Sequence, residues 1–195
     1  MTTRNSITSE TIVAAALDLI REGGWAAVSA RGIASRLGAS TMPIYTGIGS
    51  MNELKTAAFV RASSLLEASQ HKRRTDNEAL DLAIGYVVFA REEPGLFQFI
   101  FSCHEDMAPD VLRAASEEDA PGSIAGIPDV TSALGSIPSL EGRGDFIMHT
   151  WIFTHGLAGL VASGALKIDE KEITRRLEEA GAAFYLYELG KEKEQ

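Results

Sequence analysis

The sequence predicts an all-α protein, and three observations support this prediction. Its six prolines leave long proline-free tracts, as helices require; they are Pro43, Pro94, Pro109, Pro121, Pro128 and Pro138. Apolar residues recur at three- and four-residue spacing, which places them on one face of a helix. The one stretch that could pass for a strand, residues 96–102, has no partner strand in the sequence. With 195 residues, the chain is long enough for one domain or for a small domain joined to a larger one.

The first 70 residues predict four helices. The first covers residues 9–22, starts at Thr8 or Ser9 and ends at Gly23-Gly24. Its apolar stripe consists of Ile12, Ala15, Ala16, Leu19 and Ile20. The second helix starts after Ser29 and ends at Gly38, and because Gly32 weakens it by up to about 1 kcal/mol relative to alanine, tertiary packing must hold it.

The third and fourth predicted helices follow directly. Ser40 can cap a helix that runs from residue 41 to residue 46 or 47, with Pro43 in its first turn, where a missing N–H does no harm. Ser50-Met-Asn-Glu53 then has the form of a capping box, with serine at the N-cap and glutamate three residues later. It opens a long helix through about residue 70.

The rest of the chain predicts further helices and one loosely organised region. Asp76 or Asn77 can cap a helix that continues to about residue 93 and ends at Pro94-Gly95. A short buried helix is predicted at 96–102. Residues 117–144 contain three prolines and five glycines, so they are expected to be the least ordered part, with a helical turn near 129–134. Two long helices, at about 145–163 and 169–189, complete the chain.

Residues 146–166 carry no formal charge over a length that could span a bilayer. They contain two histidines, two threonines, a serine and three glycines, so we expect a helix that is buried on every side instead. Cys103 is the only cysteine, which excludes a disulfide within the chain. The sequence does not begin with a basic segment followed by an apolar run. We therefore expect a cytoplasmic protein with no membrane partner.

The charge of the chain is distributed unevenly. Residues 1–74 hold nine lysines and arginines against five acidic residues, a net charge of +4, whereas residues 75–195 hold nine against twenty-two, a net charge of −13. Only the first part is therefore suited to a polyanion such as DNA. A surplus of +4 is also common on an ordinary solvated surface, so charge alone does not establish nucleic-acid binding.

Two short helices joined by a turn that contains glycine form a helix-turn-helix. A recognition helix must enter a major groove about 12 Å wide, so it should be short, with small or polar groups near its start. Ser40, Thr41 and Thr46 are such groups, the Tyr45 hydroxyl could bond to a phosphate, and the amides of residues 50–52 could bind another. In the alternative interpretation Ser40 and Thr41 only cap the helix, and Tyr45 packs against Trp25 and Leu54.

Residues 12–54, "IVAAALDLIREGGWAAVSARGIASRLGASTMPIYTGIGSMNEL", resemble the DNA-binding domain of the tetracycline-repressor (TetR) family of bacterial transcriptional regulators. The matches are the lead-in "AALDLIREGGWAAVS", "IASRLGAS" across the turn, the "IY" of the recognition helix, and the serine-led capping box with Leu54. Further along, "HTWIFTHGLAGLVASG" is similar to the penultimate helix of some members. The resemblance implies a three-helix DNA-binding domain at 1–50, a connecting helix at 51–70, and a larger ligand-binding and dimerisation domain at 71–195.

The resemblance and the helix-turn-helix together give a set of candidate DNA-binding residues. These are Arg4, Arg31, Ser40, Thr41, Met42, Pro43, Tyr45, Thr46, Ser50 and Lys55. Arg36 is a further candidate for phosphate contact, and both Arg31 and Arg36 could instead be ordinary solvated residues. The chain departs from the family pattern where Thr41 and Met51 replace common lysines, Gly47 replaces a histidine, and Gly32 replaces an acidic residue. These departures predict weaker DNA binding with a shallower salt dependence.

The larger domain is expected to bind a small, lipophilic effector. Candidate ligand-binding residues are Phe89, Phe97, Phe101, Cys103, His104, Met107, Met148, Trp151 and His155, with Phe153 as a further pocket wall. Many of these could be plain core. The run Cys103-His-Glu-Asp106 carries metal-ligating residue types, but consecutive residues do not face one point. We therefore predict no metal and no cofactor, and the absence of a catalytic motif predicts that the protein is not an enzyme.

The last two helices are expected to form a homodimer through a four-helix bundle across a two-fold axis. The candidate interface residues are Ile152, Gly156, Leu160, Ile173, Leu177 and Phe184. Packing within one chain is the alternative. The sequence thus predicts a ligand-responsive transcriptional regulator, a repressor that an effector releases from its double-stranded DNA operator. Its alternative is a helical small-molecule-binding protein with weakened or lost DNA binding.

Overall fold

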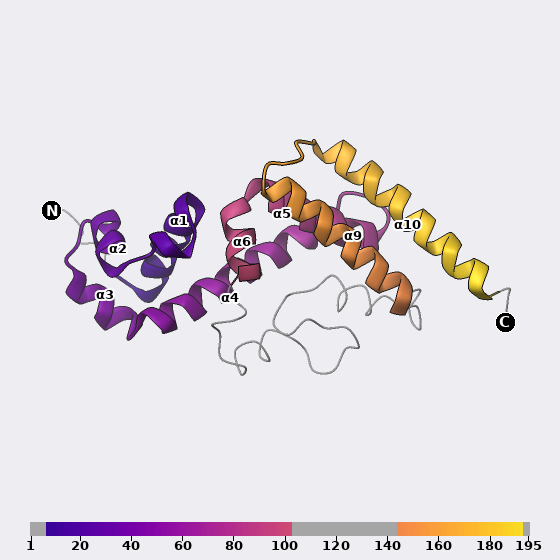
Figure 1. Ribbon diagram of the computed structural model, residues 1–195. Helices are drawn as coiled ribbons and strands as arrows, with labels where there is room; N and C mark the ends of the chain where they lie inside the picture. The colour runs from indigo at the N-terminus through magenta and orange to yellow at the C-terminus, as the bar shows by residue number, and fades with distance from the viewer. Residues whose placement is uncertain (1–6, 103–143, 193–195) are drawn as a thin grey trace. The chain divides into compact units, whose positions relative to one another are not determined.

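The computed structural model describes residues 7–102 and 144–192, and within these ranges the chain forms α-helices and one short 3-10 helix, without a β-strand. Figure 1 shows the helices in chain order. Their bounds are α1 Ser9–Gly23, η1 Trp25–Ala27, α2 Ala30–Leu37, α3 Thr41–Ile48, α4 Met51–Gln70, α5 Glu78–Glu92, α6 Pro94–Ser102, α9 Gly144–Ala162 and α10 Glu170–Glu192. The all-α prediction is confirmed. The helical turn expected near 129–134 lies outside the described residues.

The chain divides into two compact units. The described residues of the first are 7–64 and 95–102, and those of the second are 65–94 and 144–192. α4 belongs to both units. The sequence predicts domain boundaries at residues 50 and 70, which correspond to the two ends of α4. This division into domains stays a prediction.

The first unit is built around α1, α2 and α3, which pack on one another. Ile12, Ile33, Ile44 and Leu54 are fully buried in its core. Because each helix contributes a buried isoleucine and α4 contributes Leu54, the short helices are held by apolar packing and not by their own propensity. This is the support that the weak second and third helices require.

Local hydrogen bonds at the helix ends explain where α1 and α2 begin and end. The Thr8 hydroxyl accepts from the Thr11 N–H at 3.2 Å, and the Thr8 N–H donates to the Thr11 hydroxyl at 3.0 Å, which completes a capping box. The Gly32 N–H donates to the Ser29 hydroxyl at 3.0 Å. Gly24 and Gly38 end the two helices at positive φ, +67° and +62°, where glycine avoids the strain of a side chain.

The ends of α3 differ in part from the expectation. Ser40 occupies the N-cap position, but its side chain makes no capping hydrogen bond. The helix continues to Ile48, one residue beyond the expected limit, because Ile48 is buried in the core. At the start of α4 the Glu53 N–H donates to the Ser50 hydroxyl at 3.2 Å, while that hydroxyl donates to the Glu53 carboxylate at 2.9 Å. A capping box would have the Ser50 backbone N–H donate to the Glu53 side chain. In the structure the Ser50 hydroxyl donates to that carboxylate instead.

The second unit packs α5 against α9 and α10. Every residue from Asp81 to Ala90 on α5 is buried, so this helix is apolar nearly all round because neighbours surround it. At Gly85, a Cβ atom would overlap the Ser69 carbonyl oxygen and the Gln70 backbone of α4. The Ser69 hydroxyl donates to the Gly85 carbonyl oxygen at 2.9 Å, which fixes this close approach.

Asp81 ties the segment between α4 and α5 to the helix. Its carboxylate accepts from the Thr75 N–H at 2.7 Å and from the Thr75 hydroxyl at 2.8 Å. Burial by itself raises the pKa of Asp81, but the bonds from Thr75 and from the Arg74 backbone outweigh it and hold this pKa below its usual value. The carboxylate is therefore charged and satisfied in spite of its burial.

Two features of α9 bear on the uncharged stretch 146–166. No helix in the described ranges combines the length and hydropathy needed to cross a membrane. The expectation of a helix buried on every side is wrong for the single chain, because Ile152 is 55% exposed and Leu160 is 52% exposed. α9 thus has an apolar face that the described residues leave partly exposed.

Candidate nucleic-acid interface and cavity

α3 presents an exposed, uncharged surface. Met42 is 74% exposed and Tyr45 51% exposed; Ser40, Thr41 and Thr46 are exposed as well, and Pro43 is half-buried. Ile44 and Ile48 anchor the opposite side of the helix in the core. α3 contains no charged residue, so any base contact it makes must come from hydroxyl and apolar groups.

The surroundings of Trp25, Leu54 and Tyr45 bear on the two interpretations of Tyr45. Trp25, one of its suggested packing partners, stacks on Phe99 with ring centroids 5.6 Å apart and an interplanar angle of 23°. Leu54, the other, is fully buried in the core. Tyr45 keeps about half of its surface open to solvent, and the contact of its hydroxyl with a phosphate stays a prediction.

The basic side chains of the first unit have different surroundings. Arg31 is exposed, and the Lys55 ammonium lies 5.8 Å from the centroid of the Trp25 ring, a cation–π distance. Arg36 donates to both carboxylate oxygens of Glu22, at 2.6 and 2.7 Å, and lies 3.6 Å from Asp18. The bond to Glu22 raises the pKa of Arg36 above its usual value. Arg36 therefore joins α2 to α1 through an ion pair, and its contact with phosphate stays a prediction. Arg4 lies outside the described residues.

The structure gives a packing reason for two departures from the family pattern. A Cβ atom on Gly47 would come 2.6 Å from the Cδ1 atom of Ile12, which is fully buried. Met51 is half-buried and packs on the same core cluster. Both positions thus face the interior, where a histidine or a lysine would have to displace apolar neighbours.

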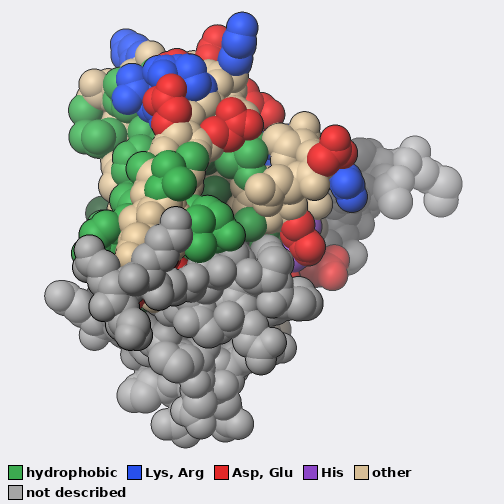
Figure 2. All heavy atoms as spheres, turned by 90° about the vertical axis from the view of Figure 1, so that its right-hand side faces the viewer, with side chains coloured by type: hydrophobic (Ala, Val, Ile, Leu, Met, Phe, Trp, Pro, Cys, Tyr) green, Lys and Arg blue, Asp and Glu red, His purple; other side chains and the backbone are tan. Residues whose placement is uncertain are grey.

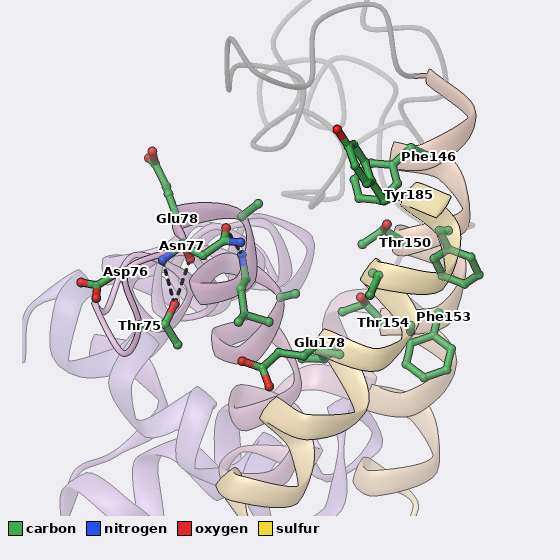
Figure 3. A pocket seen from close by; sticks show the side chains of 18 residues that line it. Thr75, Asp76, Asn77, Glu78, Phe146, Thr150, Phe153, Thr154, Glu178 and Tyr185 are labelled. Atoms are coloured by element: carbon green, nitrogen blue, oxygen red, sulfur yellow. Dashed lines mark hydrogen bonds between the residues drawn. The ribbon is translucent and has the colours of Figure 1, made fainter. Parts of the chain in front are cut away.

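The second unit contains a cavity of about 860 Å³ between the start of α5, α9 and α10. Figure 3 shows the residues around it. Its lining includes Phe146, Thr150, Phe153 and Thr154 from α9 and Glu178, Gly181, Phe184 and Tyr185 from α10. Thr75, Asp76, Asn77, Glu78, Ala79, Leu80 and Ala83 contribute the third wall. A volume of this size is typical of small-molecule sites.

Most of the sequence-predicted ligand residues lie elsewhere. Phe97 and Phe101 are on α6 in the first unit, with ring centroids 4.6 Å apart. Phe89, Met148, Trp151 and His155 belong to the second unit but do not line the cavity, whereas Phe153 does. Cys103, His104 and Met107 lie outside the described residues. Sequence reasoning missed Thr150 and Thr154, whose four-residue spacing on one helix face was the available signal.

Trp151, His155 and Tyr86 form a cluster on another face of α9. The Tyr86 hydroxyl and the His155 Nδ1 atom are 2.9 Å apart and share a hydrogen bond. Trp151 stacks on the His155 ring at 5.4 Å and 14°. Burial lowers the pKa of His155 below its ordinary value. The folded chain therefore favours neutral imidazole at this position.

This arrangement predicts a pH dependence of stability. The unfolded chain binds a proton at His155 more readily than the folded chain, so the free energy of unfolding should fall as pH decreases through about 6.5. His155→Gln should reduce that fall. Urea unfolding of both proteins at several pH values between about 5 and 8 measures the difference, and the exposed His71→Gln variant serves as the control. Identical pH profiles for the wild type and His155→Gln would contradict this assignment.

The candidate dimer residues differ in their exposure to solvent. Ile152, Gly156 and Leu160 are exposed and recur every four residues along α9. Figure 2 shows that hydrophobic side chains reach the surface of the described part of the chain, between polar and charged ones. Ile173 and Leu177 are buried in the core of their own unit, so they cannot form the interface without rearrangement. Phe184 is half-buried, with its ring 5.6 Å from that of His149 and 6.2 Å from that of Phe153.

Within the described ranges, no group of three or more histidine, cysteine or acidic side chains is placed to bind a metal. The run from Cys103 to Asp106 lies outside those ranges.

Comparison with known proteins finds the likeness in structure only. No family model matches the sequence, and no curated protein matches it. A TetR family transcription regulator from Marinobacter aquaeolei VT8 matches with a TM-score of 0.66 at 15% identity, over 94% of this chain and 98% of that one. A putative TetR-family regulator from Mesorhizobium loti MAFF303099 matches with a TM-score of 0.62 at 17% identity, over 92% and 95%.

A TetR-like transcriptional regulator from Rhodococcus sp. RHA1 matches with a TM-score of 0.55 at 18% identity, over 88% of this chain and 92% of that one. These likenesses extend over most of every chain compared, well beyond residues 12–54. The protein therefore has the fold of the TetR-family transcription regulators.

Proposed function

We propose that the protein is a homodimeric DNA-binding transcriptional regulator that acts as a repressor and releases its operator when a small molecule binds. The observation that carries this proposal is α3, a short helix anchored by Ile44 and Ile48 that exposes Met42, Tyr45 and Thr46. Such a helix has the size and the surface that the major groove accepts. The structural neighbours are described as transcription regulators, which supports the same conclusion.

A cavity of drug-like size in the second unit supports the ligand-responsive part of the proposal. A ligand shifts an equilibrium between DNA-binding and released states only by its different affinity for the two. Release from the operator therefore requires that the cavity bind the ligand more tightly in the released state than in the DNA-binding state.

The alternative, a small-molecule-binding protein that no longer binds DNA, is favoured by the absence of charged residues on α3 and by the ion pairing of Arg36. Fluorescence anisotropy with labelled DNA from the region beside the gene distinguishes the two. The regulator should form a sequence-specific complex at low salt, and its affinity should decrease less steeply with salt than that of a lysine-rich regulator. Absence of such a complex in the ligand-free protein would favour the alternative.

Tyr45→Phe should weaken operator binding by about tenfold, because it removes one hydrogen bond to a charged phosphate. The melting temperature should remain close to that of the wild type, because the side chain is half exposed. Anisotropy titration and thermal denaturation measure the two effects. Tyr187→Phe removes the same hydroxyl from an exposed position on α10 and is the matched control. Loss of the fold in Tyr45→Phe would show instead that the hydroxyl is structural.

A further inference from the structure

The cavity between α5, α9 and α10 contains a fully buried hydroxyl that lacks a partner. Thr154 is 0% exposed, and its Oγ1 atom has no hydrogen-bond partner among the described residues. The Oγ1 atom of Thr150, one helical turn earlier, is buried and unpartnered in the same way. A helical threonine can bond back to its own helix, as Thr174 does to the Glu170 carbonyl oxygen at 2.9 Å.

An unsatisfied buried hydroxyl is costly, and both of these line the cavity. A hydroxyl is both a donor and an acceptor. A ligand with a carbonyl, hydroxyl or amine group near α9 would satisfy them. Figure 3 shows the two threonines one above the other on α9.

Aromatic rings form the second feature of the cavity. Phe146 meets Tyr185 edge to face with centroids 6.2 Å apart, and Phe153 meets Phe184 in the same way, also at 6.2 Å. These four rings come from α9 and α10 and line the cavity together. Aromatic faces attract both apolar groups and organic cations.

The charged residues of the lining are all acidic. Asp76, Glu78 and Glu178 line the cavity, and none of its described lining residues is a lysine or an arginine. Glu178 extends from α10 toward α5 in Figure 3. The start of α5 carries a partial positive charge, but Glu78 lies in its first turn and offsets it. The lining therefore favours a positive ligand over a negative one.

We infer that this cavity binds a lipophilic organic cation, with its aromatic body between the four rings, a polar group at Thr150 and Thr154, and its charge toward Glu178. This inference deepens the proposed function by naming the effector class, and it rests on that function only for the effect of the ligand on DNA. Binding itself is independent of the operator.

The test uses the purified full-length chain and two xanthene dyes of similar size and opposite charge. Rhodamine 6G is a cation and fluorescein an anion, and the fluorescence anisotropy of either dye reports binding directly. Rhodamine 6G should bind saturably and at least about tenfold more tightly than fluorescein. Equal affinity for the two dyes would overturn the inference, and so would failure of rhodamine 6G to bind.

Three variants locate the site. Thr154→Val should weaken rhodamine 6G binding by about fivefold through loss of one hydrogen bond. Glu178→Gln should weaken rhodamine 6G but not fluorescein. Gly181→Met should weaken it by more than about tenfold by filling the cavity, since a Cβ atom there meets nothing within 4 Å. Because methionine is the better helix former, this variant should fold at least as well as the wild type.

The two matched controls lie on α10. Thr174→Val removes a partnered hydroxyl, and Glu179→Gln removes a carboxylate that pairs with Arg175 at 2.6 Å. Both should keep wild-type affinity for rhodamine 6G. Wild-type affinity in Gly181→Met would place the dye elsewhere and refute the assignment. If rhodamine 6G binds as expected but leaves operator binding unchanged, the cavity assignment stands and the ligand-responsive part of the proposed function fails.

Discussion

Gly85→Ala is expected to destabilise the protein by about 2 kcal/mol or more. A methyl group at this position overlaps backbone atoms of Ser69 and Gln70, and backbone cannot rotate aside as a side chain can. Overpacking typically costs about 1–3 kcal/mol and occasionally more, and an overlap with backbone belongs at or above the upper end of that range. The gain of up to about 1 kcal/mol from replacing a helical glycine offsets only part of this cost. For a chain of this size the melting temperature should fall by roughly 4 °C or more.

Thermal denaturation followed by circular dichroism at 222 nm measures this effect. Gly181→Ala is the control, because it is the same substitution inside α10 with nothing within 4 Å of the new Cβ atom. It should leave the melting temperature unchanged or raise it slightly. Equal melting temperatures for Gly85→Ala and the wild type would mean that α4 and α5 can separate without cost at their crossing.

The double variant Ile152→Glu, Leu160→Glu is expected to convert the proposed homodimer into monomers. The two side chains are more than half exposed in the single chain, one on each side of Gly156 on the same face of α9. In a two-fold interface each substitution occurs twice, so four carboxylates would be buried without partners. The cost of burying an unpaired charge should weaken the dimer by more than about 100-fold.

Sedimentation equilibrium gives the dimer dissociation constant of each protein. Val60→Glu places a charge on another exposed apolar residue, on α4, and should leave that constant unchanged. The circular dichroism of the double variant should match the wild type, because neither residue belongs to the buried core. A dimer of unchanged affinity would show that another surface joins the subunits.

The helix ends could be predicted from the sequence because they depend on residues close together in the chain. Thr8 and Ser29 cap α1 and α2, while Gly24 and Gly38 end them. Ser40 shows the limit of this reasoning. A serine before a helix can satisfy a backbone N–H, but in this chain its hydroxyl does not, and the sequence pattern cannot distinguish the two outcomes.

The surroundings of individual side chains were harder to predict because they depend on distant residues. Gly47 and Met51 resemble lost DNA contacts when compared with a family pattern, yet Ile12 and the core of the first unit explain both. From the sequence alone, Arg36 could be an unpaired arginine available to phosphate. The structure shows that it pairs with Glu22, fourteen residues earlier in the chain. Charge and composition alone contain no information on such pairings.

The cavity could not be placed from the sequence because α9 is apolar on almost every face. Its periodicity does not show which side meets α5, so Trp151 and His155 were as plausible as Phe153 for a pocket wall. Ile173 and Leu177 fit an interface pattern for the same reason, although they are buried within one chain. The sequence places Thr150 and Thr154 on one face of a helix, but only the structure shows that their hydroxyls lack hydrogen-bond partners among the described residues.

If the protein is the DNA-binding regulator proposed above, the uncharged surface of α3 affects how it would find an operator. Loose attachment to random DNA comes from ion pairs with phosphate, and in the first unit Arg21 and Arg36 are engaged with Asp18 and Glu22. The protein should therefore leave random sequence quickly and slide along it only over short distances. Excess genomic DNA would then sequester few molecules, so a small number of copies per cell could keep an operator occupied.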